Sequence, residues 1–148
     1  MRRARPAAVV LTLAATATAC GGEGVAELAV HDAWARPTPA VVSVGAVYLR
    51  VTSPVDDELV GATVDSAVAE AVQLHTTEVD TAGKATMDEQ MSLPVPAGGE
   101  LELDPFGSHL MLVGLADPLT EGEHVDVTLR FATAGEVTVD VEVAVVEP

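Results

Sequence analysis

The side chains most able to do chemistry in this chain are imidazole and thioether donors that could bind a transition metal. Beyond residue 20 the sequence contains seven of them: His31, His75, Met87, Met91, His109, Met111 and His124. Two of the seven, His109 and Met111, lie two residues apart. In a β-strand their side chains point to the same face and can reach one ion, whereas Leu110 points to the other face. This pair forms the first half of a predicted metal site.

His75 and Met87 supply the second half. His75 follows the apolar stretch 72–74, and turn-forming residues at 82–84 separate it from Met87. A chain that reverses at this turn brings Met87 back towards His75. Thioether sulfur is a soft, uncharged donor that favours Cu(I), and imidazole also binds copper well. Zinc favours cysteine or carboxylate beside histidine, and calcium requires oxygen ligands. We therefore predict Cu(I) bound by His75, Met87, His109 and Met111.

The three remaining donors are expected to lie outside this site. His31 and His124 have acidic neighbours and are predicted to be solvated surface residues. Met91 could add a third sulfur, but its position before Leu93 favours a role in packing. The acidic run 56–58 is likewise expected to be solvated surface.

Residues 1–20 have the layout of a secretory signal peptide: a basic start, an apolar run and small residues that lead to Cys20. The stretch 17–20 resembles a bacterial lipobox, which implies a lipid on Cys20 and an anchor in the membrane. An ordinary cleaved signal with an incidental Cys20 is the alternative. We expect a signal at 1–20, a tether at 21–26 and one domain at 27–148. The protein would then lie at the outer face of the cytoplasmic membrane, or in the periplasm or cell-wall space.

The charge of the chain limits its partners. The formal net charge is −16, and three of the seven Lys and Arg residues lie in the predicted signal. The rest of the chain therefore carries 4 positive against 23 negative charges, a net charge of −19. Such a surface repels phosphate backbones, so no nucleic acid partner is expected. It suits contact with cations or basic proteins, although solubility alone would also explain it.

Apolar and polar residues alternate with a period of two in several segments, and Gly- and Pro-containing turns separate them. This pattern predicts antiparallel strands and an all-β fold, either a sandwich or a Greek-key barrel. The candidate strands are 27–33, 44–51, 58–64, 69–79, 100–103, 109–113, 124–131 and 136–146.

The spacing of the four candidate ligands resembles the H(M)x10Mx21HxM motif of the periplasmic copper chaperone family PCuAC. The flanking segments 32–39, 45–49, 95–99 and 109–112 also resemble that family, and the likeness covers about residues 28–145. One departure is Thr76, where the motif often has a second methionine. The resemblance implies a cupredoxin-like Greek-key β-sandwich with an exposed Cu(I) site. It also implies copper delivery to a respiratory oxidase, often together with a thiol-containing copper protein.

Other functions are open at this stage. A copper-buffering lipoprotein for metal resistance or scavenging would use the same ligands. An electron-transfer protein of the blue-copper type needs a cysteine ligand, and no cysteine follows Cys20. A purely structural sandwich would bind no metal. We find no Ser-His-Asp pattern and no phosphate-binding glycine loop, so we do not expect an enzyme.

Overall fold

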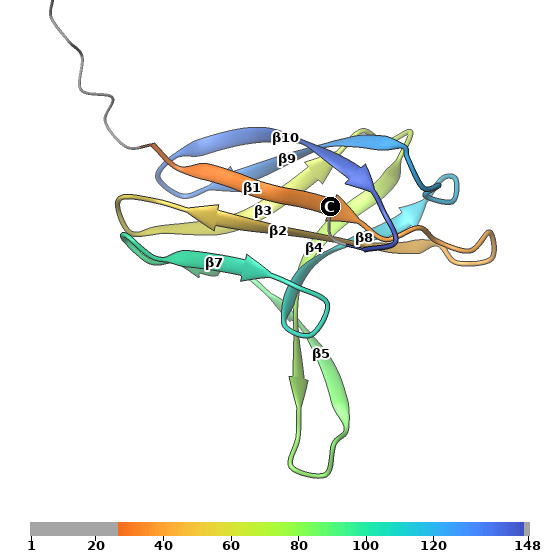
Figure 1. Cartoon of the computed structure of the whole chain (residues 1–148), viewed down its shortest axis with the longest axis horizontal. Helices are drawn as coiled ribbons and strands as arrows, with labels where there is room; N and C mark the ends of the chain where they lie inside the picture. Colours follow the sequence, from red (N-terminus) through yellow and green to blue (C-terminus); the bar gives the residue numbers. More distant parts are fainter. Residues whose placement is uncertain (1–26, 147–148) are drawn as a thin grey trace, which may run out of the picture.

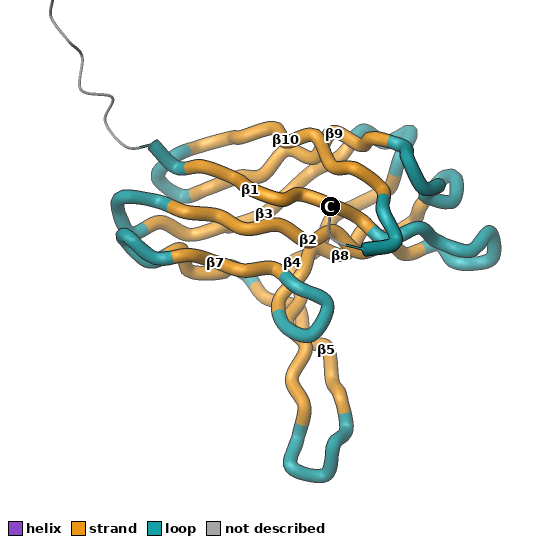
Figure 2. The backbone as a smooth tube through the Cα atoms, viewed as in Figure 1, coloured by secondary structure: helices purple, strands orange, loops and turns teal. Residues whose placement is uncertain are grey.

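The computed structural model describes residues 27–146, and this part of the chain is built from strands and turns without a helix. Figures 1 and 2 show the arrangement. The ten strands are β1 (Ala29–Ala35), β2 (Val44–Thr52), β3 (Asp57–Val64), β4 (Ala69–Val79), β5 (Ala85–Gln90), β6 (Leu93–Val95), β7 (Glu100–Leu103), β8 (Ser108–Leu115), β9 (His124–Phe131) and β10 (Gly135–Val143). The all-β prediction is confirmed. The described residues contain no helix long and apolar enough to cross a membrane.

The strands form one mixed sheet in the order β5-β4-β8-β2-β1-β10-β9-β3-β6, and β7 pairs with β2 off this path. All pairings between strands are antiparallel except that of β1 with β10. The two end strands, β5 and β6, do not pair with each other, so the sheet is open rather than a closed barrel. It folds over on itself, which gives the cupredoxin-like sandwich architecture (Figure 1).

The inward-facing residues of the two halves of the sheet share one core. Leu110 and Leu112 of β8 are fully buried, as are Val127 and Leu129 of β9. Because side chains alternate along a strand, burial of Leu110 and Leu112 directs His109 and Met111 to the outer face of β8. The core therefore fixes the face on which the candidate ligands lie.

All eight predicted strands are present, with ends that differ by up to three residues. Two strands, β5 and β6, were not predicted. The residues of β5 are exposed on both faces apart from the half-buried Gln90, so no alternation of polarity marks the strand. The second, β6, has only three residues and contains Pro94, which suits an edge strand because proline cannot donate a ladder hydrogen bond.

The hairpin of β4 and β5 extends well beyond the sandwich, and we refer to residues 76–90 as the arm (Figure 1). Its turn is closed by a hydrogen bond from the Gly83 amide to the Asp80 carbonyl at 2.9 Å. Gly83 has a φ of 81°, a left-handed conformation that costs glycine little. The Asp80 side chain accepts hydrogen bonds from the amides of Ala82 and Lys84. The predicted chain reversal between His75 and Met87 is therefore confirmed.

The expectation for the acidic run 56–58 is wrong at one position. Asp57 is only 6% exposed, because its carboxylate accepts hydrogen bonds from backbone amides of the turn between β9 and β10. The neighbouring Asp56 and Glu58 are exposed, as expected.

Candidate metal centre

His75 and His109 lie directly opposite each other on neighbouring strands, β4 and β8. Their ring centroids are 5.9 Å apart and the ring planes are tilted by 37°. The register that places them together follows from the antiparallel pairing of β4 with β8, in which Leu74 faces Leu110 in the core. The structure therefore brings together the two imidazoles that the sequence analysis selected.

The two predicted methionines lie on the same face of the sheet. Met111 is two residues from His109 and is paired with Gln73, which is two residues from His75. On the other side of β4, Met87 of β5 is paired with Thr77. Paired residues and residues two apart in a strand share a face. All four candidate ligands therefore project from the outer face of three adjacent strands, β5, β4 and β8.

Exposure increases across the four side chains. His109 is only 4% exposed, His75 and Met111 are half-buried, and Met87 on the arm is 58% exposed. Strands β4 and β8, the second and third from one end of the sheet, hold three of the donors, while the fourth lies on a hairpin that extends into solvent. A site of this kind is accessible from one side, which is what exchange of a bound ion requires.

Hydrogen bonds leave one lone pair free on each imidazole. Nδ1 of His109 donates to the carbonyl of Gly107 at 3.2 Å, so Nε2 of that ring carries the lone pair. Nε2 of His75 lies 3.1 Å from Oε1 of Gln73 and donates to it, which leaves the lone pair on Nδ1. Nδ1 of His75 is buried and has no hydrogen-bond partner. A buried acceptor without a partner is costly unless it binds something, and a metal ion would satisfy it.

Aromatic rings continue from His109 towards the middle of the sheet. The ring of Tyr48 lies 6.4 Å from that of His109, and the Trp34 ring lies 4.8 Å from Tyr48 on its other side. The guanidinium of Arg36 lies 5.9 Å from the centre of the Tyr48 ring. Burial raises the pKa of the Tyr48 hydroxyl, the guanidinium of Arg36 partly opposes this shift, and the carboxylate of Asp104 adds a smaller effect in the direction of burial. Tyr48 is therefore uncharged and packs beside His109.

Sequence reasoning did not select Gln73, Tyr48 or Gly107, which orient or cover the imidazoles. Gln73 could have been found, because it lies two residues before His75 on the same strand and so shares its face. Gly107 is likewise two residues from His109, but its contact is made by its backbone carbonyl in a turn, which its residue type does not indicate. Tyr48 meets His109 only through long-range strand pairing, which no local pattern encodes.

Carboxylates do not complete the site. Glu89 is paired with His75 and shares its face. Even so, across residues 27–146 no three His, Cys, Asp or Glu side chains come together in a way that could hold a metal ion. The donor set at this face is therefore imidazole and thioether, which matches the preference of Cu(I) rather than that of zinc or calcium.

The other three donors were predicted to be two solvated histidines and one packed methionine. His31 and His124 are exposed, and they contact Thr52 and Asp140 respectively. Met91 is 95% exposed, so the prediction that it packs in the interior is wrong. It directly follows β5, which ends at Gln90, and lines an open pocket with Gln73 and Arg130.

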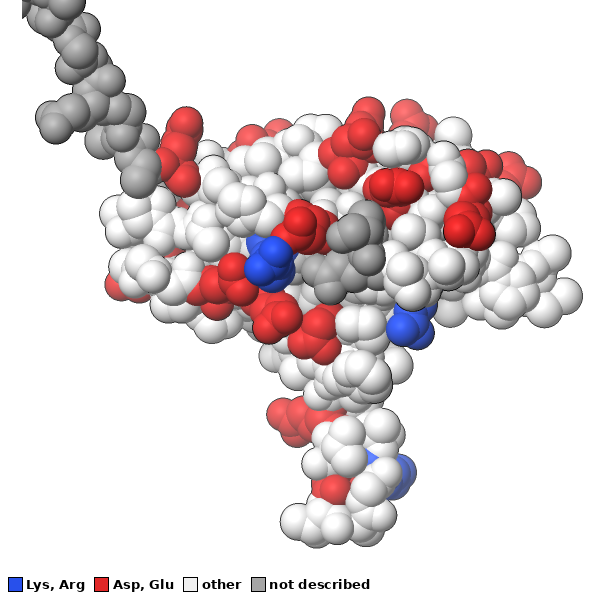
Figure 3. Space-filling view, viewed as in Figure 1, with Lys and Arg blue, Asp and Glu red and all other residues white. Residues whose placement is uncertain are grey.

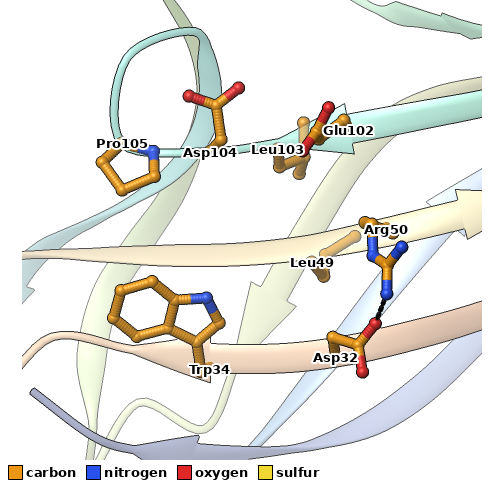
Figure 4. A pocket seen from close by; sticks show the side chains of 8 residues that line it. All are labelled: Asp32, Trp34, Leu49, Arg50, Glu102, Leu103, Asp104 and Pro105. Carbon is orange, nitrogen blue, oxygen red and sulfur yellow. Dashed lines mark hydrogen bonds and ion pairs between the residues drawn. The ribbon is translucent and has the colours of Figure 1, made fainter. Parts of the chain in front are cut away.

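A small cavity of about 30 Å³ lies beside Trp34 and contains charged side chains rather than metal donors (Figure 4). Arg50 reaches across it to form an ion pair with Asp32. Asp32 has a φ of 50° and lies where the register between β1 and β2 shifts, which turns its carboxylate towards Arg50. Because this cavity is lined by neither imidazole nor sulfur, it is a structural ion-pair site and is separate from the candidate metal centre.

Comparison with known proteins agrees with this picture. The family described as "Putative lipoprotein LpqE-like" matches residues 28–143. A curated relative from Leifsonia xyli subsp. xyli (strain CTCB07), "Putative lipoprotein Lxx21020", is 34% identical over 103 residues, which are 70% of this chain. The match spans 61% of the length of that relative.

Solved structures of PCuAC domains share the fold. The copper-bound PCuAC domain from PmoF2 is 26% identical, with a TM-score of 0.65 over 80% of this chain and 93% of that one. The solution structure of CuI-DR1885 from Deinococcus radiodurans is 29% identical, with a TM-score of 0.62 over 86% of this chain and 84% of that one. The apo PCuAC domain from PmoF1 has a TM-score of 0.68 at 23% identity, over 81% of this chain and 95% of that one. The resemblance to PCuAC domains inferred from the sequence is confirmed.

Proposed function

The chain belongs to the LpqE-like lipoprotein family, and from this premise we propose that it is an extracytoplasmic chaperone that binds Cu(I) through His75, Met87, His109 and Met111. The observation that carries the proposal is the pair of facing imidazoles, His75 and His109, with two thioethers on the same face. The copper named in two of the similar solved structures supports it.

The donor set suits an ion that must be passed on. Two uncharged sulfurs and two neutral imidazoles hold a monovalent ion without a thiolate, which outside the cytoplasm would be oxidised. Met87 on the exposed arm is the donor that an incoming ligand reaches first, because the other three are set into the sheet. Replacement of one donor at a time lets copper move to an acceptor without passing through water.

We propose that the acceptor is a respiratory oxidase, reached directly or through a thiol-containing copper protein. The second candidate is a buffering lipoprotein, which the high negative charge also favours because it concentrates cations near the surface. Growth of a deletion strain separates the two. For a chaperone we expect oxidase activity to fall at low copper and to recover when copper is added or the intact gene is restored. Normal oxidase activity together with increased copper sensitivity would instead identify a buffer.

We further propose that residues 1–20 are removed as a signal and that Cys20, which lies outside the described residues, carries a lipid. The domain at 27–148 would then be held by a short tether, 21–26, at the outer face of the cytoplasmic membrane. Cys20→Ser is expected to move the protein from the membrane fraction to the soluble extracytoplasmic fraction, as seen by immunoblotting after fractionation. A variant that stays with the membrane would argue against the anchor, and Thr18→Ser is the matched control.

A further inference from the structure

Phe106 differs from every other aromatic residue of the chain. The sequence contains one tryptophan, one tyrosine and two phenylalanines, all within the described residues. Trp34, Tyr48 and Phe131 are buried, whereas the Phe106 side chain is 85% exposed. Burial of a phenylalanine side chain stabilises a fold, and this fold does not gain that stabilisation from Phe106. A large exposed aromatic side chain is typical of the centre of a protein interface.

The position of Phe106 is fixed by its turn. Residues 104–107 connect β7 to β8, and the Asp104 amide donates to the Ser108 carbonyl at 2.8 Å. The side chain of Asp104 accepts a hydrogen bond from the Phe106 amide at 2.6 Å. Phe106 is therefore presented by a hydrogen-bonded turn, so little conformational entropy is lost when a partner covers it.

The same turn contacts the candidate metal centre. The carbonyl of Gly107, next to Phe106, accepts hydrogen bonds from Nδ1 of His109 and from the Thr77 amide at 3.0 Å. Thr77 in turn is paired with Met87. The turn that carries Phe106 and the strand that carries the exposed Met87 therefore lie on opposite sides of Thr77, and the turn lies beside the base of the arm in Figure 1. We call Phe106 and Met87 together the apolar rim of the centre.

Negative charge surrounds this rim. Asp104 precedes it, Glu102 lines the adjoining cavity, and Glu89 shares the face of His75. Residues 27–146 hold 21 of the 23 acidic residues, since Glu23 and Glu147 lie outside, and only four basic ones: Arg36, Arg50, Lys84 and Arg130. Of these, Arg50 is ion-paired and Lys84 lies at the tip of the arm. Arg36 lies beside Tyr48, and Arg130 lines a pocket with Glu89 and Gln90. Acidic side chains outnumber basic ones across the face drawn in Figure 3.

We propose that the apolar rim is the docking surface for the protein that exchanges copper with this chain, and that this partner offers an apolar socket edged with lysine and arginine. The inference rests on the proposed function. Phe106 would fill the apolar socket, and the acidic side chains would attract the lysine and arginine residues at its edge. Met87 would lie within the interface, where a ligand from the partner replaces it on copper. A membrane is a poor alternative because anionic headgroups repel this surface, and a second copy of the chain repels it in the same way.

Transfer kinetics test the proposal with two synthetic peptides as probes. Both peptides carry the same pair of cysteines as a Cu(I) site; one is flanked by Leu and Lys, and the other by Ser and Glu. We expect the copper-loaded protein to transfer Cu(I) to the Leu/Lys peptide roughly 10-fold faster or more in stopped-flow measurements at low salt, with the difference shrinking as salt is added. Phe106→Ser should slow transfer to the Leu/Lys peptide by about 10-fold, as expected for loss of an aromatic anchor. Its Cu(I) affinity and melting temperature should match the unaltered protein.

Matched variants make the result specific. Phe106→Leu should retain most of the rate, because it keeps an apolar side chain. Val41→Ser removes another exposed apolar side chain, which lies near Leu115 at the opposite end of β8 from the Phe106 turn, and should leave the rate unchanged. Transfer by Phe106→Ser at the unaltered rate, with normal Cu(I) affinity, would overturn the docking surface but leave the proposed function in place. Failure of the unaltered protein to bind Cu(I) would refute the proposed function itself. Phe106-dependent binding to phosphatidylglycerol vesicles, or a Phe106-dependent dimer in sedimentation, would assign the rim to another partner and overturn the proposal.

Discussion

Replacement of His109 and Met111 together by alanine is expected to abolish tight Cu(I) binding. The unaltered protein should bind one equivalent, whereas the double variant keeps only His75 and the exposed Met87. Loss of a partner that merely supports a ligand already costs 10–100-fold in affinity, so loss of two ligands should cost more than about 10³-fold. An anaerobic competition titration against a coloured Cu(I) chelator measures both quantities.

The chain offers a matched control for this variant. His31→Ala with His124→Ala also removes two donor side chains, but from exposed positions outside the candidate ligand set, and should bind like the unaltered protein. Because His109 is buried, its loss could also destabilise the sheet. Met87→Ala avoids this, since its side chain projects from the arm, and it should weaken binding while the melting temperature stays the same. Equal losses in the control and in the double variant would remove the basis for the site.

The candidate ligands could be chosen from the sequence. That His75 and His109 lie opposite each other could not be predicted from the residues around either of them. The His109–Met111 spacing predicts that these two share a face in any strand that contains them. The placement of His75 opposite His109 depends on the register of β4 against β8, which is set by Leu74 and Leu110 packing in the core. A shift of one residue would have turned one imidazole to the other face. In the sequence, only the resemblance to a family over both strands indicated that the two imidazoles lie together.

Burial separates the strands that could be predicted from those that could not. Where one face is buried, as in β9 and β10, alternation marks the strand clearly. The arm strand β5 has no buried face, so its residues follow no pattern, and yet it carries Met87. For Asp57 the prediction was wrong for a different reason. A charged residue in an acidic run was predicted to be exposed, but hydrogen bonds from amides far along the chain keep it buried.

Asp57→Ala is expected to lower the free energy of unfolding strongly. Its carboxylate accepts hydrogen bonds from the amides of Glu58 and Thr133 at 2.8 Å and of Ala134 at 2.9 Å. Alanine would leave these amides without that acceptor in a buried site, which should lower the free energy of unfolding by about 3 kcal/mol or more. Asp56→Ala is the control: its side chain is exposed, accepts one amide hydrogen bond from Ala97, and should cost less than about 1 kcal/mol. Urea unfolding at neutral pH measures both losses, and similar values for the two variants would contradict the assignment.

The dependence on pH gives an independent check, because the charge of Asp57 is part of the interaction. Burial acts to raise the pKa of Asp57, but the amides of Thr133, Glu58 and Ala134 outweigh it, and the pKa lies below its usual value of 3.8. A carboxyl whose pKa is lower in the folded state than in the unfolded chain stabilises the fold fully above the unfolded value. This contribution is lost as the pH falls through the lower, folded value. The difference in unfolding free energy between the unaltered protein and Asp57→Ala should therefore be constant above about pH 5 and should shrink in stronger acid. A difference that stays constant down to pH 2 would mean that the geometry of the side chain, and not its charge, holds the turn between β9 and β10.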